Sequence, residues 1–285
     1  MRKMVFFFFV LSAPFLGAEE RRVDPTWLHR YLPALSESPA DVTTPTCHYK
    51  PVFGAGEPDA GNLKSVARYG EMIVDPQGAS ALVNYPNEEQ VYFVREGTGT
   101  ILYGSEKVAI RSEDFIYVPP GIRHGVENRG IKPCRLILMG FRVPAGANLN
   151  SSAKPLLANL AEVPKQEVAG HPPSTLFQLL VGKTDSQRDK LAAAQVLTSL
   201  FVMEFDTGGT NWPHHHDREE EIYLVLEGQG EMVAGSGMDG IEGRRPAKAG
   251  DAYFFRLNCT VGFYSKTGAS EPKARILAAR SSYPF

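Results

Sequence analysis

The chain has 285 residues, of which 43% are hydrophobic, and its formal net charge is −2 at pH 7. This length corresponds to about two domains and provides enough apolar side chains for a sizeable core. The near balance of charge gives no indication of binding to nucleic acid or to an anionic membrane surface, and no nucleic-acid partner is expected.

The N-terminus has the pattern of a secretory signal. Two basic residues precede an apolar run over 4–16, and Gly17 and Ala18 follow it. The run is too short to cross a bilayer as a helix. It predicts a signal peptide over 1–18 that is cleaved after Ala18, which would leave a secreted or periplasmic protein with no stable membrane span. An uncleaved membrane anchor is the alternative.

Residues 19–62 combine prolines and polar residues with one short amphipathic stretch, Pro25 to Leu35. They contain too few apolar side chains to close a core of their own. We therefore expect an arm that packs on a domain or on a neighbouring subunit, and the second arrangement would produce a homo-oligomer.

Three cysteines, Cys47, Cys134 and Cys259, follow the expected signal. In an oxidising compartment this odd number allows one internal disulfide at most, and Cys47 with Cys134 is one pairing.

From residue 63 onward the chain consists of short alternating runs separated by Gly, Pro and Asn, which is typical of an all-β sandwich or barrel. Ala79 to Tyr85 and Gln90 to Arg95 are two of the expected strands. A connector over 143–173 contains one short helical candidate, Leu156 to Ala161, and strands resume after it.

An internal repeat relates the two sets of strands. Residues 88–99 align with 219–230 without a gap, and residues 78–80 align with 209–211. The chain therefore contains two copies of one structural unit.

The second copy carries a cluster of metal-ligating side chains. Alternate side chains of an extended strand share a face, so His214 and His216 point the same way while His215 points the opposite way. The strand that follows places Glu221 beside the imidazoles, with Tyr223 on the same face. Two nitrogens and one carboxylate oxygen can hold a divalent ion and leave positions open.

Two alternatives compete with this interpretation. The histidines can belong to a solvated polar loop, with the acidic run as an exposed turn. Glu220 is the nearest competitor for the carboxylate, but strand alternation turns Glu220 away from the face of Glu221.

The spacing Gly-x5-His-x-His-x4-Glu-x6-Gly, from Gly208 to Gly228, resembles the first conserved motif of the cupin superfamily. The second cupin motif ends in a histidine, and a degenerate form of it begins at Gly250. In that form Arg256, Asn258 and Val261 replace its proline, glycine and histidine.

The first copy differs in the opposite way, because it keeps the second motif over 114–128, including His124, and loses the first. Val83, Tyr85 and Gln90 stand where the second copy has its three ligands. These side chains with His124 offer no shell for a metal, so we expect a polar interior that satisfies itself, or a second small-molecule pocket.

The resemblance implies an all-β bicupin, which consists of two cupin-type double-stranded β-helix (jelly-roll) barrels with an N-terminal arm. The implied boundaries are 19–62 for the arm, 63–142 for the first barrel, 143–173 for the linker and 174–285 for the second barrel.

Bicupins include oxalate decarboxylases, flavonol dioxygenases and seed storage globulins, so this fold does not fix a function. We expect one divalent ion (Mn, Fe, Ni or Zn) on His214, His216 and Glu221. Because Val261 replaces the fourth ligand, the site has three ligands, unless the Cys259 thiolate serves as another.

The expected function is that of a metal-dependent enzyme, a dioxygenase, decarboxylase or related activity, on a small carboxylate, phenolic or sugar-derived substrate. The alternative is a non-catalytic protein that binds a small molecule or sugar. A purely structural role is disfavoured, because three histidines beside three glutamates have no packing use.

Overall fold

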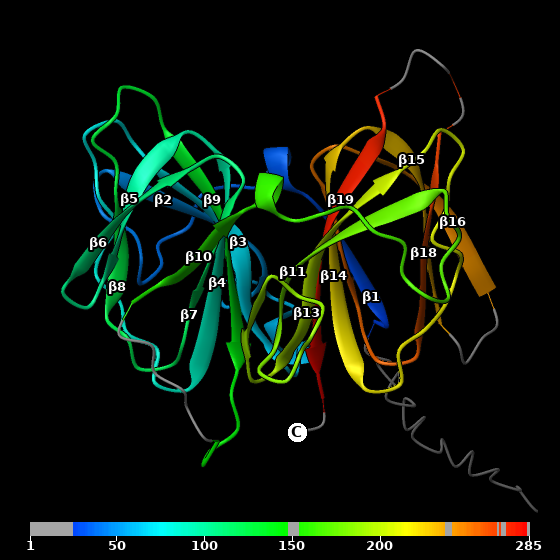
Figure 1. Ribbon diagram of the computed structural model, residues 1–285, viewed down its shortest axis with the longest axis horizontal. Helices are drawn as coiled ribbons and strands as arrows, with labels where there is room; N and C mark the ends of the chain where they lie inside the picture. Colours follow the sequence, from blue (N-terminus) through cyan, green and yellow to red (C-terminus); the bar gives the residue numbers. More distant parts are fainter. Residues whose placement is uncertain (1–24, 148–153, 237–240, 267, 269–271, 284–285) are drawn as a thin grey trace, which may run out of the picture.

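The computed structural model describes residues 25–147, 154–236, 241–266, 268 and 272–283. The expected signal peptide, residues 1–18, lies outside this part of the chain. The described residues form strands and three short 3-10 turns, arranged as two similar halves side by side (Figure 1). No helix in these ranges is long and apolar enough to cross a membrane.

The first half is built mainly from strands that precede the linker. Its strands are β2 (Cys47–Gly54), β3 (Val66–Val74), β4 (Glu88–Glu96), β5 (Thr98–Tyr103), β6 (Glu106–Arg111), β7 (Asp114–Val118), β8 (His124–Glu127), β9 (Cys134–Arg142) and β10 (Leu156–Asn159). They form a six-stranded sheet in the order β10-β7-β4-β9-β3-β2 and a three-stranded sheet in the order β6-β5-β8.

The second half repeats this arrangement and adds a strand from the arm. Its strands are β1 (Trp27–Tyr31), β11 (Thr175–Lys183), β12 (Leu191–Ala194), β13 (Leu197–Phe205), β14 (Glu219–Glu227), β15 (Gln229–Ser236), β16 (Ile241–Lys248), β17 (Asp251–Phe255), β18 (Cys259–Ser265) and β19 (Ala274–Ser282). They form a seven-stranded sheet in the order β1-β17-β14-β19-β13-β11-β12 and a three-stranded sheet in the order β16-β15-β18. The 3-10 turns are η1 (Leu32–Ala34), η2 (Ala60–Asn62) and η3 (Leu160–Glu162).

The arm packs on both halves. Strand β1 pairs antiparallel with β17 of the second half, with Trp27 opposite Phe255, and β2 pairs with β3 of the first half. In Figure 1 the blue strand β1 accordingly lies within the half that ends at the C-terminus. The arm thus spans the two halves instead of forming a separate unit.

Two local expectations were wrong. Leu156 to Ala161 was expected to be helical, but its first four residues form β10 and pair with β7. The open edge of the sheet supplies backbone hydrogen bonds, which outweigh a weak helical preference in so short a segment. Ala79 to Tyr85 was expected to be a strand, but it makes only isolated bridges, at Ala79 and Val83.

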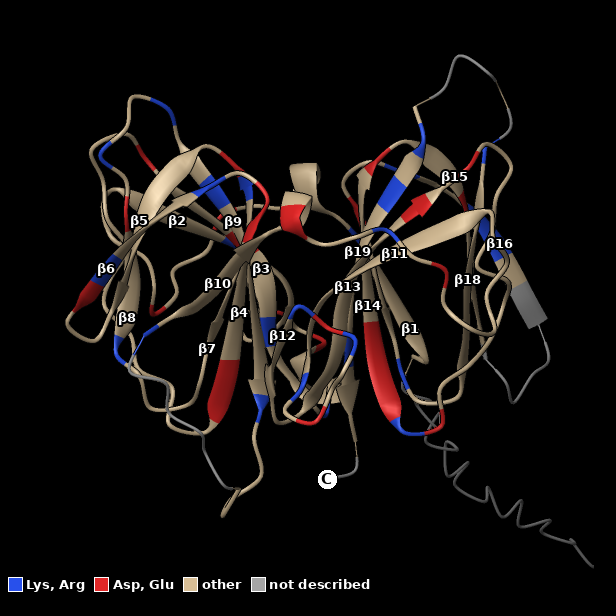
Figure 2. Cartoon of the chain, in the orientation of Figure 1, with Lys and Arg blue, Asp and Glu red and all other residues tan. Residues whose placement is uncertain are grey.

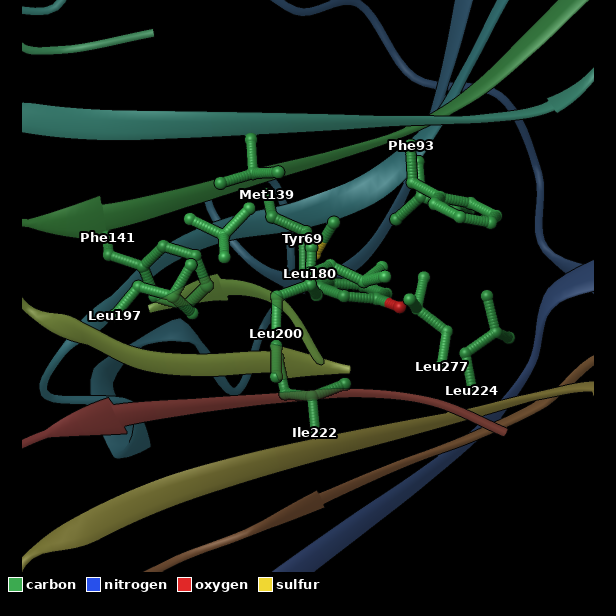
Figure 3. Packing of buried hydrophobic residues seen from close by; sticks show 14 of the residues in the cluster. Tyr69, Phe93, Met139, Phe141, Leu180, Leu197, Leu200, Ile222, Leu224 and Leu277 are labelled. Carbon is green, nitrogen blue, oxygen red and sulfur yellow. The ribbon is translucent and has the colours of Figure 1, made fainter. Parts of the chain in front are cut away.

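Alternation along the strands explains how four layers form. In β4, Tyr92 and Val94 face the three-stranded sheet of their own half, while Val91 and Phe93 face the other half. The two large sheets therefore pack against each other through a shared apolar core, which includes Phe93 and Phe141 of the first half and Leu200 and Ile222 of the second (Figure 3). The expected all-β jelly-roll fold is confirmed, although each half is a pair of facing sheets and not one closed barrel.

A reciprocal pair of buried glutamates joins the halves. Glu220, at the start of β14, accepts hydrogen bonds from the backbone N–H groups of Lys64, Ser65 and Val66, at 2.8, 2.8 and 3.3 Å, and from the Ser65 hydroxyl at 2.7 Å. Each strand that carries such a glutamate begins with an acidic run, coloured red in Figure 2. Glu220 therefore caps the start of β3 in the opposite half.

Glu89 occupies the equivalent position in the first half and makes the equivalent contacts. Its carboxylate accepts N–H bonds from Gln195, Val196 and Leu197, at 2.7, 2.9 and 2.6 Å, and the Tyr117 hydroxyl donates to it at 3.0 Å. Glu89 thus caps the start of β13. Each half thus caps a strand of the other with one glutamate. Because Glu220 faces the other half for this purpose, the neighbouring Glu221 faces the interior of its own half.

The three cysteines are buried and form no disulfide, so the expected Cys47–Cys134 pairing is absent from this structure. Burial raises the pKa of the Cys47 thiol to about 12 and that of Cys134 to about 12. Both thiols are therefore protonated and unreactive at neutral pH.

Candidate metal centre

The loop between β13 and β14 orients the first histidine of the cluster through the backbone of Trp212. This residue has φ of +53°, a left-handed conformation that is uncommon outside glycine and marks a constrained site. Its carbonyl oxygen lies 2.8 Å from Nδ1 of His214. Because a carbonyl only accepts, Nδ1 carries the proton and Nε2 is left with a free lone pair.

The degenerate second motif supports the same loop. His214 and Val261 exchange backbone hydrogen bonds of 2.9 and 2.8 Å, and the carbonyl of His216 accepts from the N–H of Asn258 at 2.8 Å. Asn258 has φ of +60°. Asparagine tolerates this left-handed conformation better than most residues, which explains how it can replace the motif glycine.

Three potential ligands converge in the second half. Ligand atoms of His214, His216 and Glu221 all lie within 4.8 Å of one another, and they form the single such group found in the described ranges. The two imidazole ring centroids are 4.9 Å apart. His215 points away, as strand alternation predicts, with its side chain 60% exposed and 3.2 Å from Asp217.

Burial and mutual contact set the charges of this group. Burial lowers the pKa of His214. Burial also opposes protonation of His216, but contact with the Glu221 carboxylate outweighs it and raises the pKa of His216. Burial alone would raise the pKa of Glu221, but the same contact lowers it. An ion pair between His216 and Glu221 thus balances the charge when no metal is present.

This group fits a divalent ion. His216 Nε2 and Glu221 Oε2 lie 3.3 Å apart, and both are buried without a hydrogen-bond partner among the described residues. Once the proton of this ion pair is released, both atoms are buried acceptors, and a divalent ion can take the place of the proton between them. Ligand atoms that share one ion at about 2.1 Å lie at most about 4.2 Å apart, so only a slight contraction of the group is required.

The fourth position of the cupin motif is apolar here. Val261 is 1% exposed and lies in the interior apolar cluster of the second half, directly opposite His214. Cys259 is outside the ligand group, and its Sγ lies 2.7 Å from the carbonyl oxygen of Gly235. The structure therefore brings together His214, His216 and Glu221, but does not bring Cys259 to them.

Replacing Val261 with His is expected to add a nitrogen ligand, because residues directly opposite each other in an antiparallel pair share a face. The affinity for Mn²⁺ should rise by about tenfold to a hundredfold, the size of effect typical of changes around a metal shell. A chelator competition titration would measure it, with Val261→Leu as the control for side-chain size. Equal affinities of the two variants would contradict the assignment.

In the first half, Arg68 lies beside Tyr85, the residue that corresponds to His216 of the second half. Nη1 of Arg68 donates to the Tyr85 hydroxyl at 3.0 Å and to Asp41 at 2.8 Å, and its Nε donates to Glu88 at 3.0 Å. Gln90 donates to the same Glu88 oxygen at 2.9 Å. The Arg68 guanidinium thus already neutralises the carboxylate of Glu88. No metal-ligating group was found here in the described ranges.

His124, the retained histidine of the first half, is 1% exposed, and burial lowers its pKa. Its Nδ1 lies 2.7 Å from the Ile122 carbonyl oxygen, while Nε2 has no partner among the described side chains and backbone. We expected the polar side chains of this interior to pair with one another. This holds for the Tyr85 hydroxyl, whereas Gln90 Oε1 and His124 Nε2 have no hydrogen-bond partner among the described residues.

Sequence reasoning missed two residues beside the cluster, His171 and Arg280. They contribute to a cavity of about 210 Å³ whose lining includes His171, Phe177, His214, Glu221, Tyr223 and Arg280. The His171 ring centroid is 5.3 Å from that of His214. No motif marks His171, because it comes from the connector. Arg280 could be found only from the β14–β19 register, in which it lies opposite Glu221.

Two further hollows lie nearby. A groove of about 760 Å³ also touches the cluster, and its lining includes His216, Arg218 and Pro144. A hollow of about 900 Å³ lies beside β1, where its lining includes His29 and Lys248. Of these three hollows among the described residues, the cavity and the groove contain members of the ligand group.

Fold and site together define a protein with two jelly-roll halves and a candidate metal centre in the second. A sequence model of the cupin domain matches residues 70–140 and 201–268. The chain belongs to the cupin superfamily and is a bicupin.

Known proteins resemble the chain at a distance. An uncharacterized protein of Methanocaldococcus jannaschii is 30% identical over 71 residues, which are 25% of this chain and 57% of that protein. This chain thus spans little more than half the length of the curated relative.

Two solved structures share the fold at low identity. Protein Ylba of E. coli has a TM-score of 0.66 at 15% identity, covering 92% of this chain and 94% of that one. The oxalate decarboxylase of Lactobacillus farciminis, solved as a formate complex, has a TM-score of 0.66 at 12% identity, covering 90% and 86%. These likenesses establish the fold only.

Proposed function

We propose that the protein is a metal-dependent enzyme that acts on a small organic molecule at one divalent ion in its second half. The convergence of His214, His216 and Glu221 beside a cavity carries this proposal. When bound, the ion would supply Lewis-acid or redox chemistry at its open positions. Two nitrogens and one oxygen suit Mn, Fe, Ni or Zn.

The surrounding residues suit a small substrate. The cavity, about 210 Å³, is smaller than the roughly 300 Å³ at which pockets for drug-sized ligands begin. Phe177 and Met203 form part of its wall and limit the access of water on that side. Trp212 fixes the ring of His214 through its carbonyl, so the ligand is oriented before anything binds.

A structurally similar oxalate decarboxylase, solved with formate, supports a small acid as the kind of substrate to examine first. The N-terminal pattern over 1–18 supports secretion or a periplasmic location. Mass spectrometry of the mature protein would test this, because an N-terminus at Glu19 is expected and an intact Met1 would contradict it.

Elemental analysis of the purified full-length protein should find one divalent metal equivalent per chain. The first half should bind no metal, because the Arg68 guanidinium already neutralises the carboxylate of Glu88. Two equivalents, with one retained after His216→Ala, would show that the first half is also a metal site.

The metal-loaded protein should then be incubated with a panel of small acids and phenols, and both oxygen consumption and product formation should be followed. Turnover that disappears on metal removal is expected. Tight binding of a panel member without turnover would favour the alternative, a non-catalytic binding protein.

A further inference from the structure

The cavity beside the ligand group presents hydrogen-bond donors that have no acceptor. The first is the Tyr223 hydroxyl, which accepts a hydrogen bond from Nδ2 of Asn211 at 2.9 Å. This is its single hydrogen bond among the described residues, so its own proton has no acceptor there. Asn211 is itself fixed, because its Oδ1 accepts from the N–H of Phe263 at 2.8 Å. Tyr223 lines the cavity.

The second donor is the Arg280 guanidinium. Arg280 lies opposite Glu221 in the β14–β19 pairing and lines the same cavity. Its Nε is buried without a hydrogen-bond partner among the described residues, at 4.0 Å from Glu221 Oε1. Its Nη1 is 3.6 Å from Glu219 Oε2, and its guanidinium carbon is 5.4 Å from the Phe201 ring centroid. These distances are too long for hydrogen bonds, so a cationic donor remains available.

The charge of the lining favours an anion. Its charged side chains are Arg188, Arg280 and Glu221. Arg188 is 49% exposed and lies 3.8 Å from Asp189, so Arg280 and Glu221 leave the lining close to neutral before any metal is counted. A divalent ion on Glu221 would add two positive charges. Beside two donors that lack hydrogen-bond partners, this charge favours an anionic occupant, and a carboxylate has the geometry to accept from a guanidinium and a phenol together.

One side of the wall is apolar. Phe177, Leu179, Phe201 and Met203 line the cavity, and all four belong to or adjoin the interior core of the second half. An occupant with additional polar groups on that side would lose hydrogen bonds to water without replacement. The part of the occupant that faces this wall should therefore be a small hydrocarbon.

We propose that this cavity binds a small organic carboxylate, with its carboxylate between Arg280 and Tyr223 and its hydrocarbon part against Phe177, Phe201 and Met203. The inference rests on the proposed function, because it places the substrate on the cavity side of the metal ligands. It assigns Arg280 and Tyr223 as the residues that select the charge of the substrate.

Calorimetric titration of the Mn²⁺-loaded protein with propionate and with propionamide tests the proposal, because the two probes share a size and differ in charge. Propionate should bind at least about tenfold more tightly. Arg280→Gln and Tyr223→Phe should each weaken propionate binding by about tenfold or more, as loss of a hydrogen bond to a charged group does, and should leave propionamide unchanged.

Arg275→Gln is the matched control. Arg275 lies on the same strand but pairs with Glu113 at 2.8 Å outside the cavity, so its loss should not change propionate binding. Arg280→Lys, which keeps the charge, should retain part of the affinity. Unfolding curves would show that each variant is folded.

Equal binding of propionate and propionamide would overturn the proposal, as would wild-type propionate affinity in both cavity variants. Metal content measured on the same samples separates this result from the proposed function. If the wild-type protein binds no metal, the proposed function fails. The metal-free protein then decides the carboxylate inference, which stands if propionate binding depends on Arg280 and falls if it does not.

Discussion

Glu220→Gln is expected to lower the free energy of unfolding by roughly 2–5 kcal/mol. The carboxylate of Glu220 accepts from three backbone N–H groups and one hydroxyl at the start of β3. A glutamine has one acceptor oxygen and an NH₂ group that faces donors, so buried N–H groups lose their partner. Glu89→Gln should have a comparable effect, because Glu89 makes the same kind of contacts with β13.

Urea denaturation would measure the change. Glu96→Gln is the control, because Glu96 lies on the same strand as Glu89 and its side chain is 71% exposed. The folded Glu220→Gln protein should still bind metal, since Glu221 keeps its position. If both buried variants were as stable as the control, the glutamates would not be the junction between the halves.

His216→Ala is expected to abolish stoichiometric metal binding without unfolding the protein. His216 supplies one of three ligand atoms, and its Nε2 faces Glu221 Oε2 at 3.3 Å. Loss of a ligand should weaken binding by more than the tenfold to hundredfold seen for changes to its supporting residues. The fold should survive because the core of each half and the core between them are apolar and independent of the ion.

Metal content after dialysis and the urea midpoint, measured on the same samples, would separate these two effects. The neighbouring His215→Ala is a matched control, because its side chain is 60% exposed and lies outside the ligand group. Equal loss of metal in the two variants would show that the ion binds on the surface run and not at the buried cluster.

Local pattern was sufficient for part of this protein. The periodicity of two along β14 separates Glu221 from Glu220, and the gapless repeat identifies two copies of one fold. The spacing around His214 and His216 predicts their convergence because strand geometry is regular over a few residues. Tyr223 was also placed correctly on the face of Glu221, although its hydroxyl was not recognised as a donor.

Other features depend on contacts between residues far apart in the chain. Nothing near Glu89 or Glu220 shows that each caps a strand of the opposite half, since the two partners are separated by 106 and 155 residues. The strand β10 also depends on a distant partner, because its residues have a helical pattern but pair with the edge strand β7. Local preference is worth little free energy in a short segment, and long-range pairing outweighs it.

The cavity was likewise decided by tertiary structure. His171 comes from the connector, Tyr223 from β14 and Arg280 from β19, and only the β14–β19 pairing and the packing of the connector beside it place the three around one space. The chemistry of each ligand is a local property of its residue and strand. The shape and charge of the cavity beside them arise from the packing of strands that are far apart in the chain, and the sequence alone does not show this packing.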